Sequence, residues 1–217
     1  MKILLMGATG RTGKQIIIEA IKRGHCISAI ARDLSKLKDY QIDIVLGTPY
    51  DRETVEKAIS GCEVVVNTLN ISRKTDNPWA KLAAPEDLIS KFAANAVYAM
   101  KKAGIKRFIA LSTIGAGSSW RTSPLILKLI VSFSNLKFAF IEHGRQEEIL
   151  QKSNVEFTIC RAPMLSTKMN ITGAVAVREE KKPQKPILSR NSAAEFFIDI
   201  IENNANIREI VNLSNKE

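Results

Sequence analysis

Short apolar segments rich in β-branched residues alternate along the chain with longer segments whose apolar residues recur at the period of a helix. The first apolar run, Lys2–Met6, is continuous, as expected of a parallel strand that is covered on both faces. Residues 13–24 then carry isoleucines and alanine at helical spacing and stop at a glycine. This alternation continues to the end of the chain and is typical of consecutive βα units.

The same pattern predicts the remaining elements. The expected strands cover residues 2–6, 26–31, 42–47, 62–69, 107–113, 155–163 and 209–214. The expected helices cover residues 13–24, 51–61, 85–102, 142–152 and 192–204, with a further apolar helix from about residue 125. The simplest topology for this order is a doubly wound, mainly parallel sheet of six to seven strands. We therefore expect an α/β protein with a single-domain Rossmann fold.

A glycine-rich turn joins the first expected strand to the first expected helix. Gly7, Gly10 and Gly13 form a GxxGxxG motif at this point. Glycines there permit a tight turn, close approach of a pyrophosphate to the backbone, and close packing of the helix on the strand. The alternative is a structural turn that binds no ligand. The residues of this turn predicted to contact a dinucleotide are Gly7, Thr9, Gly10, Arg11, Thr12 and Gly13.

The residue after the second strand distinguishes NAD from NADP, because an acidic side chain there bonds the ribose hydroxyls and repels a 2′-phosphate. The chain has Arg32 at this point, and Arg11 stands inside the glycine turn. Two guanidinium groups that converge on one phosphate favour NADP(H) over NAD(H). A solvated Arg32 paired with Asp33 is the alternative.

Several segments resemble the atypical short-chain dehydrogenase/reductase family, in particular its NmrA-like and flavin reductase/biliverdin reductase B-like branches. The resemblance covers essentially the whole chain, through GATGRTG, ARDLSKL, CEVVVNTL, KKAGIKRFIALST and EHGRQEEILQKSNVEFTICRAPML. It implies an NAD(P)H-binding Rossmann domain. We expect this domain to span residues 1–217, with a small substrate-side region over about residues 161–190.

Classical members of the wider short-chain dehydrogenase/reductase superfamily protonate the reacting oxygen with a tyrosine whose pKa is lowered by a lysine four residues later. Tyr98 and Lys102 have this spacing, but they lie on the helix before the fifth strand instead of after that strand. We interpret this pair as ordinary helix surface. The expected general acid is therefore absent from its usual place.

The remaining candidates for catalysis lie at the carboxyl edge of the sheet, which faces the ligand crevice in open α/β folds. Ser112 resembles the serine of the reductase branch and is a candidate to bond the nicotinamide amide or a substrate carbonyl; a strand-end hydroxyl that caps backbone is the alternative. His143 matches a histidine of the flavin-reductase resemblance and is a candidate proton donor with a pKa near neutrality. A helix-terminal surface histidine is the other interpretation.

Six residues at this edge are expected to contact the cofactor: Thr68, Leu69, Ser112, Thr113, Arg161 and Pro163. For Arg161, a structural ion pair is the alternative.

Reduction of a flavin or a similar conjugated acceptor requires few protein groups, because the cofactor supplies the hydride. The sequence therefore predicts an NADP(H)-dependent reductase that uses flavin or a quinone-like compound as a substrate and not as a bound prosthetic group. The rival is a non-catalytic NADP(H)-binding redox sensor that resembles NmrA-like proteins and docks through the apolar segment PLILKLIVSF. A sugar-nucleotide epimerase is disfavoured, because little chain remains for a sugar-binding lobe. Aromatic residues expected either in the acceptor pocket or in the core are Trp79, Trp120, Phe133, Phe138 and Phe140.

Composition narrows the expected setting. The formal net charge is +10, but basic residues stand beside acidic ones along the chain, so we expect no nucleic-acid partner. No apolar run reaches eighteen residues, and the first residues lack signal-peptide features, so we expect no membrane span. The scattered cysteines and two histidines predict reduced thiols of a cytoplasmic protein and no metal site. The expected partner is an aromatic or conjugated small molecule, and the expected state is a monomer or homodimer.

Overall fold

The computed structural model describes residues 1–167, 173–179, 181 and 185–216 of the 217-residue chain. The main sheet contains β1 (Lys2–Met6), β2 (Cys26–Ala31), β3 (Asp43–Leu46), β4 (Val64–Asn67), β5 (Arg107–Thr113), β6 (Glu156–Ala162), β8 (Ala174–Arg178) and β10 (Glu209–Asn215). The helices are α1 (Arg11–Lys22), α2 (Arg52–Ile59), α3 (Leu88–Ala103), α4 (Leu125–Ser132), α5 (Leu136–Lys152) and α6 (Arg190–Glu202). Two short strands, β7 (Met164–Ser166) and β9 (Ile187–Ser189), form a separate parallel pair.

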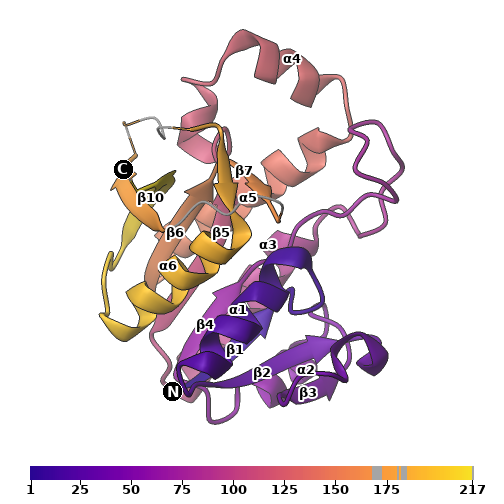
Figure 1. Ribbon diagram of the computed structural model, residues 1–217. Helices are drawn as coiled ribbons and strands as arrows, with labels where there is room; N and C mark the ends of the chain where they lie inside the picture. The colour runs from indigo at the N-terminus through magenta and orange to yellow at the C-terminus, as the bar shows by residue number, and fades with distance from the viewer. Residues whose placement is uncertain (168–172, 180, 182–184, 217) are drawn as a thin grey trace.

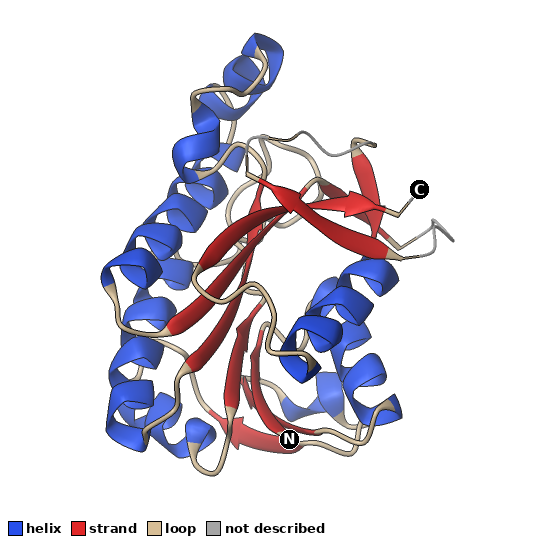
Figure 2. Cartoon of the chain, turned by 90° about the vertical axis from the view of Figure 1, so that its left-hand side faces the viewer, coloured by secondary structure: helices blue, strands red, loops and turns tan. Residues whose placement is uncertain are grey.

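The main sheet has eight strands in the order β3-β2-β1-β4-β5-β6-β10-β8, with helices on both faces (Figures 1 and 2). Every described pairing in it is parallel except that of β10 with β8. The predicted doubly wound, mainly parallel α/β fold is therefore confirmed. The strand order reverses between β1 and β4, which places a ligand crevice at the carboxyl ends of these two strands.

Two apolar layers form the core, one on each face of the sheet. Ile16 of α1 and Phe197 of α6 belong to the layer on one face. Phe92 of α3 and Leu150 of α5 belong to the layer on the other face. Both faces of the central strands are thus covered, which explains why residues 3–6 are buried without alternation.

Three strands have no counterpart in the sequence prediction. β8 gains its strand conformation from antiparallel pairing with β10, a partner distant in sequence that no local pattern reports. β7 and β9 are three residues each and pair only with one another. All three lie within the expected substrate-side region over residues 161–190, of which residues 168–172, 180 and 182–184 are outside the described residues.

Two helices begin at residues that differ from those predicted from the sequence. α3 begins at Leu88, three residues after Pro85. α5 begins at Leu136 instead of near Glu142, because its first residues, LKFAFI, are apolar on nearly every side and show no helical period. On this segment Ala139 is buried, whereas Ile141 is about half exposed.

Gly13 allows the first turn of α1 to pack directly on the end of β1. A Cβ atom at Gly13 would overlap the carbonyl oxygen of Gly7, which is rigid backbone. At Gly10 the φ angle is −78° and an added Cβ would lie 3.1 Å from the same oxygen. The turn therefore tolerates a methyl group much better at Gly10 than at Gly13.

We expect Gly13→Ala to lower the free energy of unfolding by about 1–3 kcal/mol, because the overlap forces the helix away from the strand. Urea denaturation followed by circular dichroism measures this loss. Gly10→Ala is the matched control and should be clearly less destabilised. Equal losses in the two variants would contradict the assigned contact.

Candidate active site

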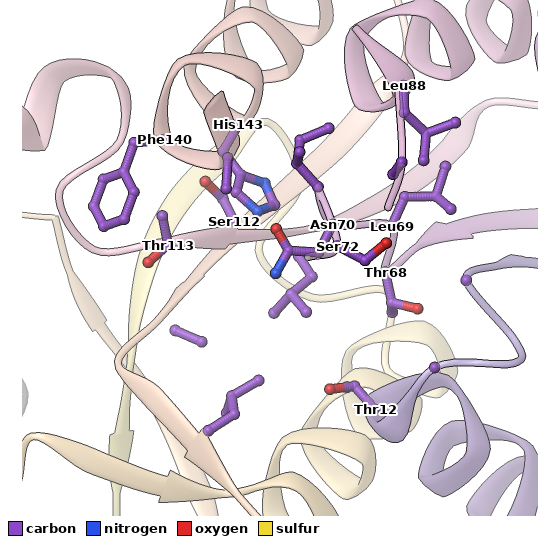
Figure 3. A pocket seen from close by; sticks show the side chains of 18 of the residues that line it. Thr12, Thr68, Leu69, Asn70, Ser72, Leu88, Ser112, Thr113, Phe140 and His143 are labelled. Atoms are coloured by element: carbon purple, nitrogen blue, oxygen red, sulfur yellow. The ribbon is translucent and has the colours of Figure 1, made fainter. Parts of the chain in front are cut away.

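One large cavity follows the carboxyl edge of the sheet (Figure 3). Its volume is about 1590 Å³. The ends of β1, β2 and β5 line it, together with Ala162 at the end of β6 and the loops that follow these strands and β4. Pockets for one small ligand commonly occupy 300–1,000 Å³. This cavity therefore has room for a dinucleotide and a second small molecule.

The glycine turn forms one end of the cavity. Gly7, Thr9, Gly10, Arg11 and Thr12 line it, whereas Gly13 is buried in the packing of α1 on β1. The N-cap residue of α1 is Gly10, which has no side chain to cap the helix, and no described hydrogen bond from another side chain takes its place. The first backbone N–H groups therefore remain available to an anion. This end has the geometry of the predicted pyrophosphate site.

Arg32 lies directly after β2, is exposed, and lines the same cavity. Its neighbour Asp33 accepts hydrogen bonds from the backbone N–H and the hydroxyl of Ser35, and these bonds lower the pKa of Asp33. No described ion pair joins Asp33 to Arg32. Lys36, which the sequence analysis did not single out, lines the cavity beside this turn and adds a second cation.

Arg11 has a partner that the sequence did not indicate. Its two terminal nitrogens donate to the carboxylate of Asp76, at 2.9 and 3.2 Å. Asp76 belongs to the irregular segment over residues 70–84, many of whose residues line the cavity. This segment thus reaches across to the glycine turn.

Ser112 and Thr113 lie at the end of β5 and line the middle of the cavity (Figure 3). The buried hydroxyl of Ser112 donates to Oε1 of Glu147 at 2.6 Å. Because its only proton is committed, Ser112 has lone pairs left with which to accept a hydrogen bond. Of its two predicted roles, accepting from the nicotinamide amide fits, and donating to a substrate carbonyl does not.

Arg161 is a buried ion-pair partner and does not belong to the cavity wall. Its Nε and Nη2 donate to Glu147 at 2.9 and 2.6 Å, and Nη1 donates to Glu179 at 2.7 Å. Burial opposes the charge, but the bonds to both carboxylates outweigh it and raise the pKa of Arg161. The structural alternative for Arg161 is therefore the one observed, and this network holds Ser112 in place through Glu147.

His143 occupies the middle of α5, so the expectation of a helix-terminal surface residue is wrong. The side chain lines the cavity, is 5% exposed, and its Nδ1 has no hydrogen-bond partner (Figure 3). Burial lowers the pKa of His143 to about 4, in place of the value near neutrality that the sequence suggested. At pH 7 the ring is therefore neutral. It can form a hydrogen bond with a ligand, but it carries no extra proton to donate as a general acid.

The rest of the expected acceptor pocket is only partly as predicted. Phe140 lines the cavity and packs edge-on against Trp120, with ring centroids 6.3 Å apart. Trp79 and Phe133 are instead 62% and 75% exposed, and the Trp79 indole donates to the carbonyl of Phe133. The described lining residues do not include Trp120 or Phe138. Apolar lining residues that the sequence did not indicate include Ile71, Leu88, Leu127, Leu136 and Met164.

The other predicted contacts fall on the cavity wall. Thr68, Leu69 and Pro163 line it, although the Thr68 hydroxyl already donates to the carbonyl of Met6. Tyr98 and Lys102 lie on the exposed surface of α3, away from the cavity, as interpreted. Among the described residues no cluster of three His, Cys, Asp or Glu side chains is placed to hold a metal ion. None of the described helices combines the length and apolar character that a membrane crossing requires.

Because the pKa of His143 is lower in the folded protein than in the unfolded chain, folding becomes less favourable in acid. The unfolded imidazole gains its proton near pH 6.5, and the folded one only near pH 4, so stability is lost as the pH falls through this window. We expect wild type to lose about 3 kcal/mol more than His143→Leu between pH 7 and pH 4. Urea denaturation at both pH values measures the difference. The same pH slope in both proteins would show that His143 titrates normally.

The comparison with known protein families covers most of the chain. Residues 7–204 match a family model described as NAD(P)H-binding. Photosystem II assembly factor Ycf39 of Guillardia theta is 33% identical over 161 residues, which make up 73% of this chain and 45% of that protein. The chain thus spans less than half the length of this relative.

Two solved structures show the same fold. ChuY from Escherichia coli O157:H7, described as an anaerobillin reductase, has a TM-score of 0.81 at 19% identity, with 100% of this chain and 98% of that chain covered. A short-chain dehydrogenase/reductase of Veillonella parvula, solved in complex with NADP, has a TM-score of 0.76 at 17% identity, with 98% and 94% covered. At such identities the likeness concerns the fold.

Proposed function

Because the chain belongs to the NAD(P)H-binding family, we propose that it is an NADP(H)-dependent reductase that transfers a hydride to a flat, conjugated acceptor such as a flavin or a quinone. One observation carries this proposal. A single cavity joins the uncapped glycine turn and Arg32 to an apolar end near Phe140. A dinucleotide and an acceptor can therefore lie in it end to end.

The cofactor half of the cavity accounts for NADP(H). The first turn of α1 supports the pyrophosphate with backbone N–H groups. Arg32 and Lys36 supply positive charge where the adenosine 2′-phosphate belongs, at the end of β2. The NADP bound to the Veillonella parvula structure supports this choice of cofactor.

The acceptor half accounts for reduction without a strong acid. Reduced nicotinamide supplies the hydride, and the protein has to align two flat rings and exclude water. Ser112 accepts a hydrogen bond from the carboxamide, which sets the orientation of the nicotinamide. The ring of His143 is neutral and adds no charge of its own to the cavity wall, which also includes Glu179 and Lys181. A proton taken up from solvent after the hydride transfer completes the two-electron reduction. The name of ChuY, anaerobillin reductase, supports an acceptor of this conjugated type.

A non-catalytic NADP(H) sensor is the second candidate, and the outer face of α4 favours it. Leu125 and Ile126 on this helix and Phe133 directly after it are 72%, 66% and 75% exposed, which is unusual for large apolar side chains so close together. α4 stands at the end of the molecule opposite the N-terminus (Figure 1). The likeness to assembly factors is compatible with a docking role for this face.

Turnover distinguishes the two functions. We expect the protein to oxidise NADPH in the presence of at least one of FMN, FAD or a panel of quinones, as followed by absorbance at the nicotinamide band. Arg32→Ala serves as the matched variant that should raise the KM for NADPH. Tight NADPH binding without turnover on any acceptor would instead support the sensor.

Cofactor preference has its own test. Arg32→Ala removes a charged partner of the 2′-phosphate, so NADPH affinity should fall about tenfold or more, while NADH affinity stays within about threefold. Titration of each nucleotide by isothermal calorimetry gives both dissociation constants. Lys101→Ala removes an equal charge from the exposed end of α3 and is the control. If both nucleotides weaken equally, Arg32 does not bind the 2′-phosphate.

A further inference from the structure

Arg190 is an arginine on the cavity wall whose guanidinium is left partly unsatisfied. It is the first residue of α6, is half-buried, and lines the cavity. Its Nε is buried and has no hydrogen-bond partner. None of the ion pairs in the described ranges includes Arg190. A buried donor without an acceptor is costly, so this group is a candidate to receive one from a ligand.

Arg11, the first residue of α1, lies close enough for the two charges to interact. Helices α1 and α6 pack side by side, and both begin at the carboxyl edge of the sheet (Figure 1). Burial and then the charge of Arg11 lower the pKa of Arg190, and Asp76 acts in the opposite direction. Two guanidinium groups are thus held near one another within the cavity.

Asp76 provides one carboxylate for these two cations. The side chains of Arg11 and Asp76 are 61% and 83% exposed, so their ion pair lies in water and contributes little stability. Described ion pairs bring no second carboxylate to Arg11 or Arg190. The charge of Arg73, another residue of the cavity wall, also acts on Asp76, so positive charge exceeds negative charge around this carboxylate and favours an anionic ligand.

We propose that Arg11 and Arg190 together bind the oxyanion of a ligand in this cavity, and that Asp76 occupies Arg11 only while that ligand is absent. The pyrophosphate of the dinucleotide is the favoured source, because Arg11 belongs to the glycine turn. A carboxylate on the acceptor has the same chemistry and is the other source. This assignment rests on the proposed function, since it uses the same cavity and cofactor.

The proposed site predicts opposite effects on anion affinity for substitutions of Arg190 and of Asp76. Arg190→Gln removes a charged ligand contact, so affinity for the anion should fall. Asp76→Asn removes the competing charge, so Arg11 becomes free and affinity should rise. A merely structural role for Asp76, as a holder of Arg11 in its binding position, predicts the opposite sign.

The experiment measures dissociation constants by isothermal calorimetry for wild type, Arg190→Gln, Arg190→Lys and Asp76→Asn. The probes are NADPH, inorganic pyrophosphate and benzene-1,2-dicarboxylate, which carries carboxylates but no phosphate. Lys101→Gln is the control for loss of one charge at a distance. Thermal melting checks that each variant is folded, and Arg190→Lys keeps the charge if Arg190→Gln fails to fold.

We expect Arg190→Gln to weaken NADPH and pyrophosphate about tenfold to a hundredfold, Arg190→Lys to weaken them less, and Asp76→Asn to tighten them about twofold to fivefold. Loss confined to the dicarboxylate would keep the two-arginine site but assign it to the acceptor. If Arg190→Gln and Arg190→Lys match Lys101→Gln with every probe, or if Asp76→Asn weakens binding, the proposal is overturned. Absence of NADPH binding to wild type itself would instead remove the proposed function.

Discussion

The close contact between the first turn of α1 and the end of β1 determines where a ligand can bind in this protein. Only a residue without a Cβ atom fits at Gly13, and the φ angle of +81° at Gly7 likewise favours glycine. Together they bring the start of α1 to the carboxyl edge of the sheet at the point where the strand order reverses. Everything assigned to the cofactor, from the uncapped N–H groups to Arg32, is arranged around this contact.

Burial decides what the polar groups of the cavity can do. Ser112 and Arg161 both lie at strand ends, yet their donors are committed to Glu147, and Arg161 also bonds Glu179. His143 reaches the cavity from α5, but burial keeps it neutral. The cations that remain exposed on the cavity wall include Arg32 and Lys36, which follow β2.

The sequence was sufficient for the fold because its central strands and helices have clear periods and glycine signals. The sequence did not predict β8, because this strand forms by pairing with the distant β10. It also did not predict the start of α5, because the first residues of that helix are apolar on nearly all sides and show no helical period. For the site, strand ends identified Thr68, Ser112, Thr113 and Pro163 as lining residues. It could not show that Glu147 engages Ser112, or that Asp76 reaches Arg11, because these partners lie 35 and 65 positions away.

A crystal structure of the protein with bound NADP would show whether the glycine turn and Arg32 hold the cofactor. We expect the pyrophosphate at the first turn of α1, the 2′-phosphate beside Arg32 and Lys36, and the carboxamide N–H bonded to the Ser112 hydroxyl oxygen. The nicotinamide would then face the apolar end of the cavity near Phe140. A nucleotide bound outside this cavity, or one whose nicotinamide points away from Ser112, would contradict this expectation.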